Sequence, residues 1–193
     1  MAEIVPTILA TTLAEYHDRL EQIKPFATRI HVDISDGDFT PTKTINLAHV
    51  YVPEGVELDL HLMVKDPFSH LESALALKPR LVIIHTEAEG NHQYCIAELQ
   101  SFGVDAGIAL LPESTVEENA ELLKKADHAL IFTGDLGHNG GTLDATQLHK
   151  LQEVKTLNEE IETSVDGGVN TENAAAIDAD VLFVGSAYML MVS

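Results

Sequence analysis

Two histidines and two aspartates of this sequence have the residue types and the spacing of a divalent-metal site. His31 and Asp33 stand two apart in the apolar run IHVDIS, so their side chains point to the same face of a predicted strand. The turn residues 36–38 follow at once, which places the pair at the C-terminal end of that strand. His61 lies in the run VELDLHLMV, and Asp166 ends the run IETSVD. Mixed imidazole and carboxylate ligands suit Zn²⁺, Fe²⁺, Mn²⁺ or Co²⁺ better than Mg²⁺.

Eight short apolar runs, separated by helical patterns, are the elements that must bring these residues together. The two kinds of segment alternate at a spacing of roughly 25 residues, which indicates βα units and a parallel sheet. The predicted strands span residues 4–9, 29–35, 56–64, 80–86, 105–111, 128–133, 161–165 and 181–185. Eight such units in one domain, residues 1–193, predict a (β/α)8 TIM barrel, in which functional side chains gather at the C-terminal strand ends.

The helices predicted around this barrel make it a shortened one. Apolar periodicity predicts helices over residues 12–26, 67–78, 92–102, 115–126 and 144–160, and a short one over 171–177. Segment 45–52 is too short and too β-branched for a helix, and only the apolar residues 188–193 stand where the last helix belongs, so we expect that helix to be largely missing. An open doubly wound sheet is the alternative fold, but the sequence lacks the Gly-x-Gly-x-x-Gly turn expected after its first strand.

The composition indicates a soluble protein of a reducing compartment. The 193 residues are 45% hydrophobic, which supports a full core, and no apolar run approaches the roughly 18 residues of a membrane span. The apolar stretch 4–9 is too short for a signal-peptide core, and one cysteine cannot form an internal disulfide, so a cytoplasmic location is expected. The net charge of −20 argues against nucleic acid or a membrane surface as a partner. An anionic substrate would therefore be held by backbone N–H groups or by a metal.

Seven motifs, in order along essentially the whole chain, resemble those of the ribulose-phosphate 3-epimerase family. They are PTILA at 6–10, HVDISDGDFTP at 31–41, LDLHLMV at 58–64, HTEA at 85–88, GIALLPEST at 107–115, VDGGVN at 165–170 and VGSA at 184–187. The resemblance implies that His31, Asp33, His61 and Asp166 together bind one divalent metal ion.

The resemblance also implies an isomerase that interconverts D-ribulose 5-phosphate and D-xylulose 5-phosphate in the pentose phosphate pathway. Inverting C3 of such a sugar phosphate removes a proton next to a carbonyl and returns it on the opposite face. Asp33 and Asp166, facing each other across the substrate, would be the catalytic acid–base pair and would exchange roles with the direction of the reaction. The metal would stabilise the charge of the enediolate as it develops.

The residues expected to bind this substrate lie at strand ends and in glycine-rich turns. Thr7, His61 and Met63 would surround the sugar. The turns after strands six, seven and eight would hold the phosphate through backbone N–H groups, because glycine lets the backbone approach a ligand closely. The turn residues are Gly137, His138, Asn139, Gly140, Gly167, Gly168, Gly185 and Ser186.

The sequence leaves three points open: the substrate, the role of His85 and the oligomeric state. Ser35 and Phe132 stand where the family has methionine, so a 3-epimerase of a hexulose phosphate such as allulose 6-phosphate and a catalytically inactive sugar-phosphate-binding barrel are the alternative functions. His85 is interpreted either as a structural hydrogen-bond donor or as a residue that supports the site from behind it. Apolar surface around the predicted eighth strand would be covered by a second copy of the chain, so a homo-oligomer is expected.

Overall fold

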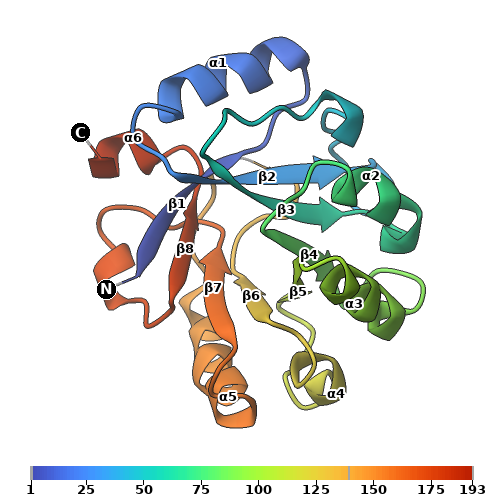
Figure 1. The fold of residues 1–193 in the computed structure, drawn as a ribbon. Coiled ribbons are helices and arrows are strands. Elements are labelled where there is room, and N and C mark those ends of the chain that lie inside the picture. Colours follow the sequence, from blue (N-terminus) through green and yellow to red (C-terminus); the bar gives the residue numbers. More distant parts are fainter. Residues whose placement is uncertain (1, 139, 193) are drawn as a thin grey trace.

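Eight parallel strands close into a barrel in the computed structural model, which describes residues 2–138 and 140–192 (Figure 1). Neighbouring strands pair in chain order, and the last strand closes onto the first. The predicted TIM barrel is thereby confirmed. The strands are β1 (Glu3–Ile8), β2 (Arg29–Ser35), β3 (Glu57–Met63), β4 (Leu81–His85), β5 (Asp105–Leu110), β6 (His128–Phe132), β7 (Glu162–Asp166) and β8 (Val181–Val184).

Helices of very unequal length surround the barrel (Figure 1). In the described part of the chain the α-helices are α1 (Leu13–Ile23), α2 (Leu71–Leu75), α3 (His92–Ser101), α4 (Ala120–Leu123), α5 (His149–Leu157) and α6 (Tyr188–Val192). Short 3₁₀ turns cover Leu47–His49, Pro67–His70, Ala145–Leu148 and Ala174–Ala176. The first helix begins as the sequence predicts, because Thr12 and Glu15 form a reciprocal capping box.

Several predicted helices are shorter in the structure than their apolar periodicity suggests. The segments 67–78 and 144–160 each begin with a 3₁₀ turn, and 171–177 contains only a 3₁₀ turn. Asp66 and Asp144 cap the 3₁₀ turns that follow them, because each accepts a hydrogen bond from the backbone N–H group two residues on. Periodicity locates the buried face, which a 3₁₀ turn also keeps, so it overestimates helix length.

The chain end carries a five-residue helix in place of a full-length last helix. This helix, α6, contacts β1, and its Leu190 side chain is exposed. The expected contact with a second copy of the chain stays a prediction.

The inside of the barrel contains an apolar layer between two polar ends. Alternation along the strands points one set of side chains inward and the other toward the helices. The inward apolar layer consists of Val5, Leu81, Ile83, Ala109, Leu130, Val181 and Phe183. The outward side chains form a larger core with the helices. The apolar layer therefore separates the predicted site at the C-terminal strand ends from the N-terminal ends.

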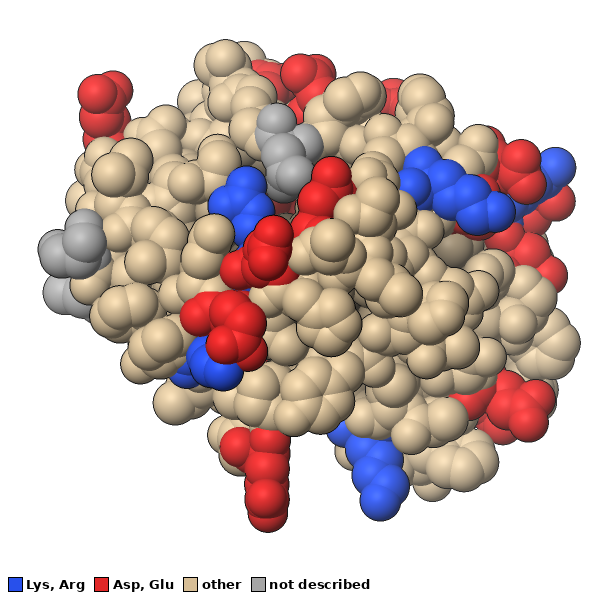
Figure 2. Space-filling view, turned by 90° about the horizontal axis from the view of Figure 1, so that it is seen from above, with Lys and Arg blue, Asp and Glu red and all other residues tan. Residues whose placement is uncertain are grey.

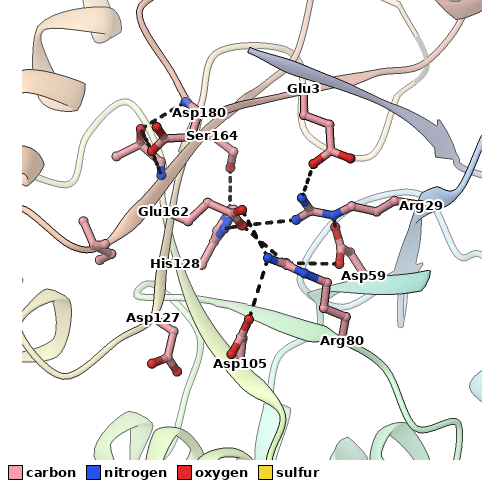
Figure 3. A network of polar contacts seen from close by, with 12 residues as sticks. Glu3, Arg29, Asp59, Arg80, Asp105, Asp127, His128, Glu162, Ser164 and Asp180 are labelled. Carbon is pink, nitrogen blue, oxygen red and sulfur yellow. Dashed lines mark hydrogen bonds and ion pairs between the residues drawn. The ribbon is translucent and has the colours of Figure 1, made fainter. Parts of the chain in front are cut away.

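A network of ion pairs fills the N-terminal end of the barrel (Figure 3). The guanidinium of Arg29 lies 2.7 Å from Glu3, 2.7 Å from Asp59 and 3.1 Å from Glu162. His128 joins Glu162 at 2.8 Å through Nδ1. Arg29 and Asp59 are both buried, and Arg29 is the nearer of two cations beside Asp59, since Arg80 Nη1 lies 3.8 Å from it.

Replacing Arg29 by Met is expected to lower the free energy of unfolding by about 3–5 kcal/mol, because it removes the 2.7 Å ion pair of the buried Asp59 carboxylate and leaves only Arg80, whose Nη1 lies 3.8 Å away. Urea unfolding measures the difference. The control is Glu3→Gln, which removes a largely exposed partner of the same guanidinium and should cost less than about 1 kcal/mol. Equal losses in the two variants would contradict the prediction.

The structure shows no membrane-spanning helix among the described residues, and the face drawn in Figure 2 carries charges of both signs. No helix in the described part of the chain is both long and apolar enough to cross a membrane. On the face drawn in Figure 2, acidic and basic side chains stand among uncharged ones, and the described residues there form no continuous patch of either sign. The cytoplasmic location and the absence of nucleic-acid partners stay predictions.

Candidate active site

The four predicted metal ligands meet inside the C-terminal end of the barrel. β2 carries His31 and Asp33, β3 carries His61, and β7 carries Asp166. All four residues are buried, and one ligand atom of each can be chosen so that the four atoms lie within 4.8 Å of one another. The strand register pairs Asp33 directly with His61, so both face the barrel interior. Residues 135 positions apart in sequence thus form one cluster.

The distances within this cluster fit a single bound cation. Asp33 Oδ1 lies 2.9 Å from His61 Nδ1 and 3.2 Å from His31 Nε2, and both nitrogens lie 3.9 Å from Asp166 Oδ2. His31 Nε2 is buried and has no hydrogen-bond partner. A buried polar atom without a partner costs free energy, which a cation shared by the four side chains would offset. The donor set of two imidazoles and two carboxylates therefore fits one divalent metal ion.

The two carboxylates have opposite electrostatic environments. Burial by itself would raise the pKa of Asp33, but the close contacts and charges of His31 and His61 outweigh it and hold that pKa below its ordinary value. Burial, together with the nearby charge of Asp33, raises the pKa of Asp166. One carboxylate is thereby kept ionised while the other retains a proton more readily, as a base and an acid require.

Neighbouring side chains hold the ligands in place. The Phe183 ring packs against the His31 ring with centroids 3.9 Å apart. The Thr133 hydroxyl donates to the backbone carbonyls of Asp166 and Gly167 at 3.0 and 2.7 Å, which fixes the end of β7. These contacts limit the freedom of the ligands before any ion or substrate binds.

A cavity of about 260 Å³ adjoins the cluster, and both Asp33 and Asp166 line it. Nine of the residues expected to bind substrate line it as well: Thr7, Met63, Gly137, His138, Gly140, Gly167, Gly168, Gly185 and Ser186. His61 is buried and does not line the cavity, so the structure groups it with the candidate metal ligands and not with the substrate-binding residues. Asn139 lies outside the described residues. The described lining contains no Lys or Arg.

Two glycines after β7 allow neighbouring loops to come into contact beside this cavity. Gly167 has φ +107° and Gly168 has φ +74°, a region that other residues rarely adopt. A Cβ atom would overlap the backbone of Gly134 at the first position and that of Leu143 at the second. Only glycine therefore lets the loop after β6 close against the loop after β7.

Several residues of the cavity were not singled out as binding residues from the sequence. Leu9, Asp135 and Asn170 line it, and so does Phe183. Alternation along β8 places Phe183 inward, but nothing in the sequence indicates that its ring lies against His31. Asn170 belongs to the motif VDGGVN, which was the available signal for it.

The arrangement can move a proton to and from a carbon atom held in the cavity. An ionised and a more readily protonated carboxylate border the same cavity, next to a group of atoms that fits a cation. Such a site suits proton abstraction next to a carbonyl, because one carboxylate can accept the proton while a cation stabilises the oxygen that gains charge.

A family model and the sequences of known proteins both match this chain, and they agree on one family. Residues 3–189 match the model of the "Ribulose-phosphate 3 epimerase family". The ribulose-phosphate 3-epimerase of Bacillus subtilis (strain 168) is 30% identical over 199 residues, which cover 97% of this chain and 92% of that protein. The ribulose-phosphate 3-epimerase of Schizosaccharomyces pombe is 27% identical, and the match covers 96% of this chain and 86% of that protein.

Solved structures of other enzymes share the barrel. The 3-hexulose-6-phosphate synthase from Salmonella typhimurium superimposes with a TM-score of 0.68 at 15% identity, covering 97% of this chain and 90% of that one. Tryptophan synthase from M. tuberculosis gives a TM-score of 0.70 at 16% identity, covering 98% and 85%. These likenesses show the fold alone. The sequence match over nearly the full length shows more: the chain belongs to the ribulose-phosphate 3-epimerase family of isomerases.

Proposed function

We propose that this protein is a metal-dependent 3-epimerase that interconverts D-ribulose 5-phosphate and D-xylulose 5-phosphate. The observation that carries the proposal is the pairing of Asp33 and Asp166, which border one cavity and share contacts with the same two histidines. Membership of the family supplies the reaction, and the two carboxylates supply the groups that it needs.

Asp33 and Asp166 are the acid–base pair of the proposed reaction. In one direction the ionised Asp33 accepts the C3 proton, and Asp166 returns a proton to the opposite face. In the reverse direction the two residues exchange roles. In the metal-free protein the pKa values of the two residues shift in opposite directions, which supports different roles for the pair.

His31, Asp33, His61 and Asp166 would hold the divalent metal ion of the proposed enzyme. When bound, the ion supplies positive charge that stabilises the charge developing on the enediolate oxygens. Thr7 adds a neutral polar group, because its Oγ1 is buried without a hydrogen-bond partner and the residue lines the cavity. We infer that this hydroxyl binds a substrate oxygen and that Met63 packs against the substrate's carbon chain.

The phosphate would lie against the glycine-rich turns after β6, β7 and β8. These turns form much of the cavity wall, and the described lining contains no cationic side chain. Backbone N–H groups are therefore the donors that we propose for the phosphate, in agreement with the acidic charge of the chain.

Chelation should abolish turnover, and a divalent ion should restore it. The assay measures xylulose 5-phosphate formed from ribulose 5-phosphate on protein with known metal content, before and after chelator treatment and after addition of Zn²⁺, Fe²⁺, Mn²⁺ or Co²⁺. We expect about one ion per chain and activity that follows the ion content.

Other results of this assay would correct the proposal in defined ways. Full turnover by metal-free protein would contradict metal dependence. Bound metal without turnover would contradict the pentulose substrate, and allulose 6-phosphate would be tested next. Sugar-phosphate binding without epimerisation of either substrate would favour the binding protein over the enzyme.

A further inference from the structure

His61 makes polar contacts on both sides of its ring. Nδ1 faces the candidate metal site and lies 2.9 Å from Asp33 Oδ1, while Nε2 lies 2.8 Å from Nε2 of His85. Two imidazole nitrogens at this distance share one proton, so one ring donates and the other accepts. Which ring donates decides whether His61 Nδ1 carries a lone pair or a hydrogen.

Glu87 stands at the far side of His85. Its Oε2 lies 3.3 Å from His85 Nδ1, within ion-pair distance, and neither of these buried atoms makes a hydrogen bond in the described structure. The other oxygen, Oε1, accepts hydrogen bonds from the Leu111 N–H at 2.9 Å and from the Ser114 hydroxyl. Burial would raise the pKa of Glu87, but its contacts with His85 and Ser114 outweigh burial and lower that pKa to about 2.

The three side chains form a line that is closed to solvent at its centre. His61 and His85 are wholly buried, and the ring of His85 packs beside Phe39 with centroids 5.0 Å apart. His92 Nε2 lies 2.9 Å from the backbone carbonyl of His85, which secures the end of β4. Water has little access to these contacts and cannot easily replace one of them. When the hydrogen moves to the other nitrogen of one ring, the hydrogen on the next ring must therefore move as well.

We propose that Glu87 and His85 are positioning residues that keep the ring proton of His61 on Nε2 and leave its Nδ1 lone pair for the metal. The carboxylate of Glu87 holds a hydrogen on His85 Nδ1, so His85 Nε2 is an acceptor. His61 Nε2 must then be the donor, and when a metal ion is bound between the ligands the Nδ1 lone pair is directed at that ion instead of Nδ1–H at Asp33. The inference rests on the proposed metal-dependent function and deepens it.

Glu87→Gln tests this line with a side chain of nearly the same shape. The amide oxygen can keep the bonds from Leu111 and Ser114, which turns the amide NH₂ toward His85 Nδ1. His85 then carries its hydrogen on Nε2, opposite the hydrogen on His61 Nε2. We expect Zn²⁺ to bind about 10–100-fold more weakly, measured in the absence of substrate by competition with a chromophoric chelator.

Glu89→Gln is the matched control, because Glu89 is an exposed residue two positions further on whose carboxylate pairs with Lys65. It should bind Zn²⁺ as the original protein does. Circular dichroism checks that each variant is folded. If Glu87→Gln does not fold, Ser114→Ala replaces it, since that change keeps the carboxylate, removes one of its donors and should weaken Zn²⁺ binding by a smaller factor.

The nitrogen NMR spectrum of the histidine rings reports the proton positions directly. In the Zn²⁺-loaded protein we expect hydrogen on Nε2 of His61 and on Nδ1 of His85, and in Glu87→Gln we expect His85 to switch to Nε2. Equal Zn²⁺ affinity in the Glu87→Gln and Glu89→Gln variants would overturn the inference and leave the proposed function standing. If the unsubstituted protein binds no Zn²⁺, Fe²⁺, Mn²⁺ or Co²⁺, both are overturned.

Discussion

Asp33→Asn is expected to lower epimerase turnover by about 10³–10⁴-fold while the barrel stays folded. An amide cannot accept a proton from the substrate carbon, and it is a weaker ligand for a divalent ion than a carboxylate. Asp33 is also the carboxylate nearest to both histidines, so the change affects proton transfer and ion binding together. Turnover is measured with ribulose 5-phosphate, and exchange of the C3 proton with deuterium oxide reports the chemical step alone.

Asp38→Asn is the matched control for this prediction. Asp38 lies in the loop that follows the same strand, is exposed, and is not among the residues that line the cavity. It should keep nearly full turnover. Retention of turnover by a folded Asp33→Asn variant would contradict the acid–base assignment and would favour the binding protein.

Asp166→Asn is expected to reduce turnover about as strongly as Asp33→Asn does. It should raise the stability of the metal-free protein, whereas Asp33→Asn should lower it. The pKa of Asp166 is raised above its ordinary value of 3.8, so the native state disfavours the ionised form. As the pH rises from that value through the raised pKa, the unfolded chain releases its proton first and the metal-free protein loses stability. The amide that replaces this carboxyl group does not titrate, so the substitution removes the loss, and the variant should gain stability over the same pH window.

Asp33→Asn should show the reverse behaviour in metal-free protein. The pKa of Asp33 is lowered, so its ionised form stabilises the native state above the ordinary pKa, and that stability is lost as the pH falls through the lowered value. At neutral pH the Asp33→Asn variant should therefore melt below the original protein and the Asp166→Asn variant above it. Thermal unfolding with chelator between pH 5 and 8 makes the comparison, with Asp38→Asn as the unchanged reference. A melting-temperature change of the same sign in both variants would contradict the opposed pKa shifts.

The sequence alone was sufficient to predict the barrel and the four candidate metal ligands. Each predicted strand has a counterpart in the structure, because alternation and β-branched runs report which side chains are buried in a sheet. The same alternation put His31 and Asp33 on one face, and the order of the runs placed His61 and Asp166 at equivalent strand ends. Parallel strands in a closed barrel have all their C-terminal ends on one side, so these local patterns were enough to predict that the four residues meet.

Only the tertiary structure decided how far the pKa of each site residue is shifted and which side chains hold that residue in place. Ser114 lies 27 positions from Glu87, and Arg29 lies 133 positions from Glu162, and neither contact has a local signal in the sequence. The opposed pKa shifts of Asp33 and Asp166 depend on distances of a few ångströms among buried charges. Helix lengths also differ from the periodic pattern, since 3₁₀ turns capped by Asp66 and Asp144 stand where the pattern predicts α-helix. Periodicity determines which way a side chain points, whereas strand register and packing determine what it meets there.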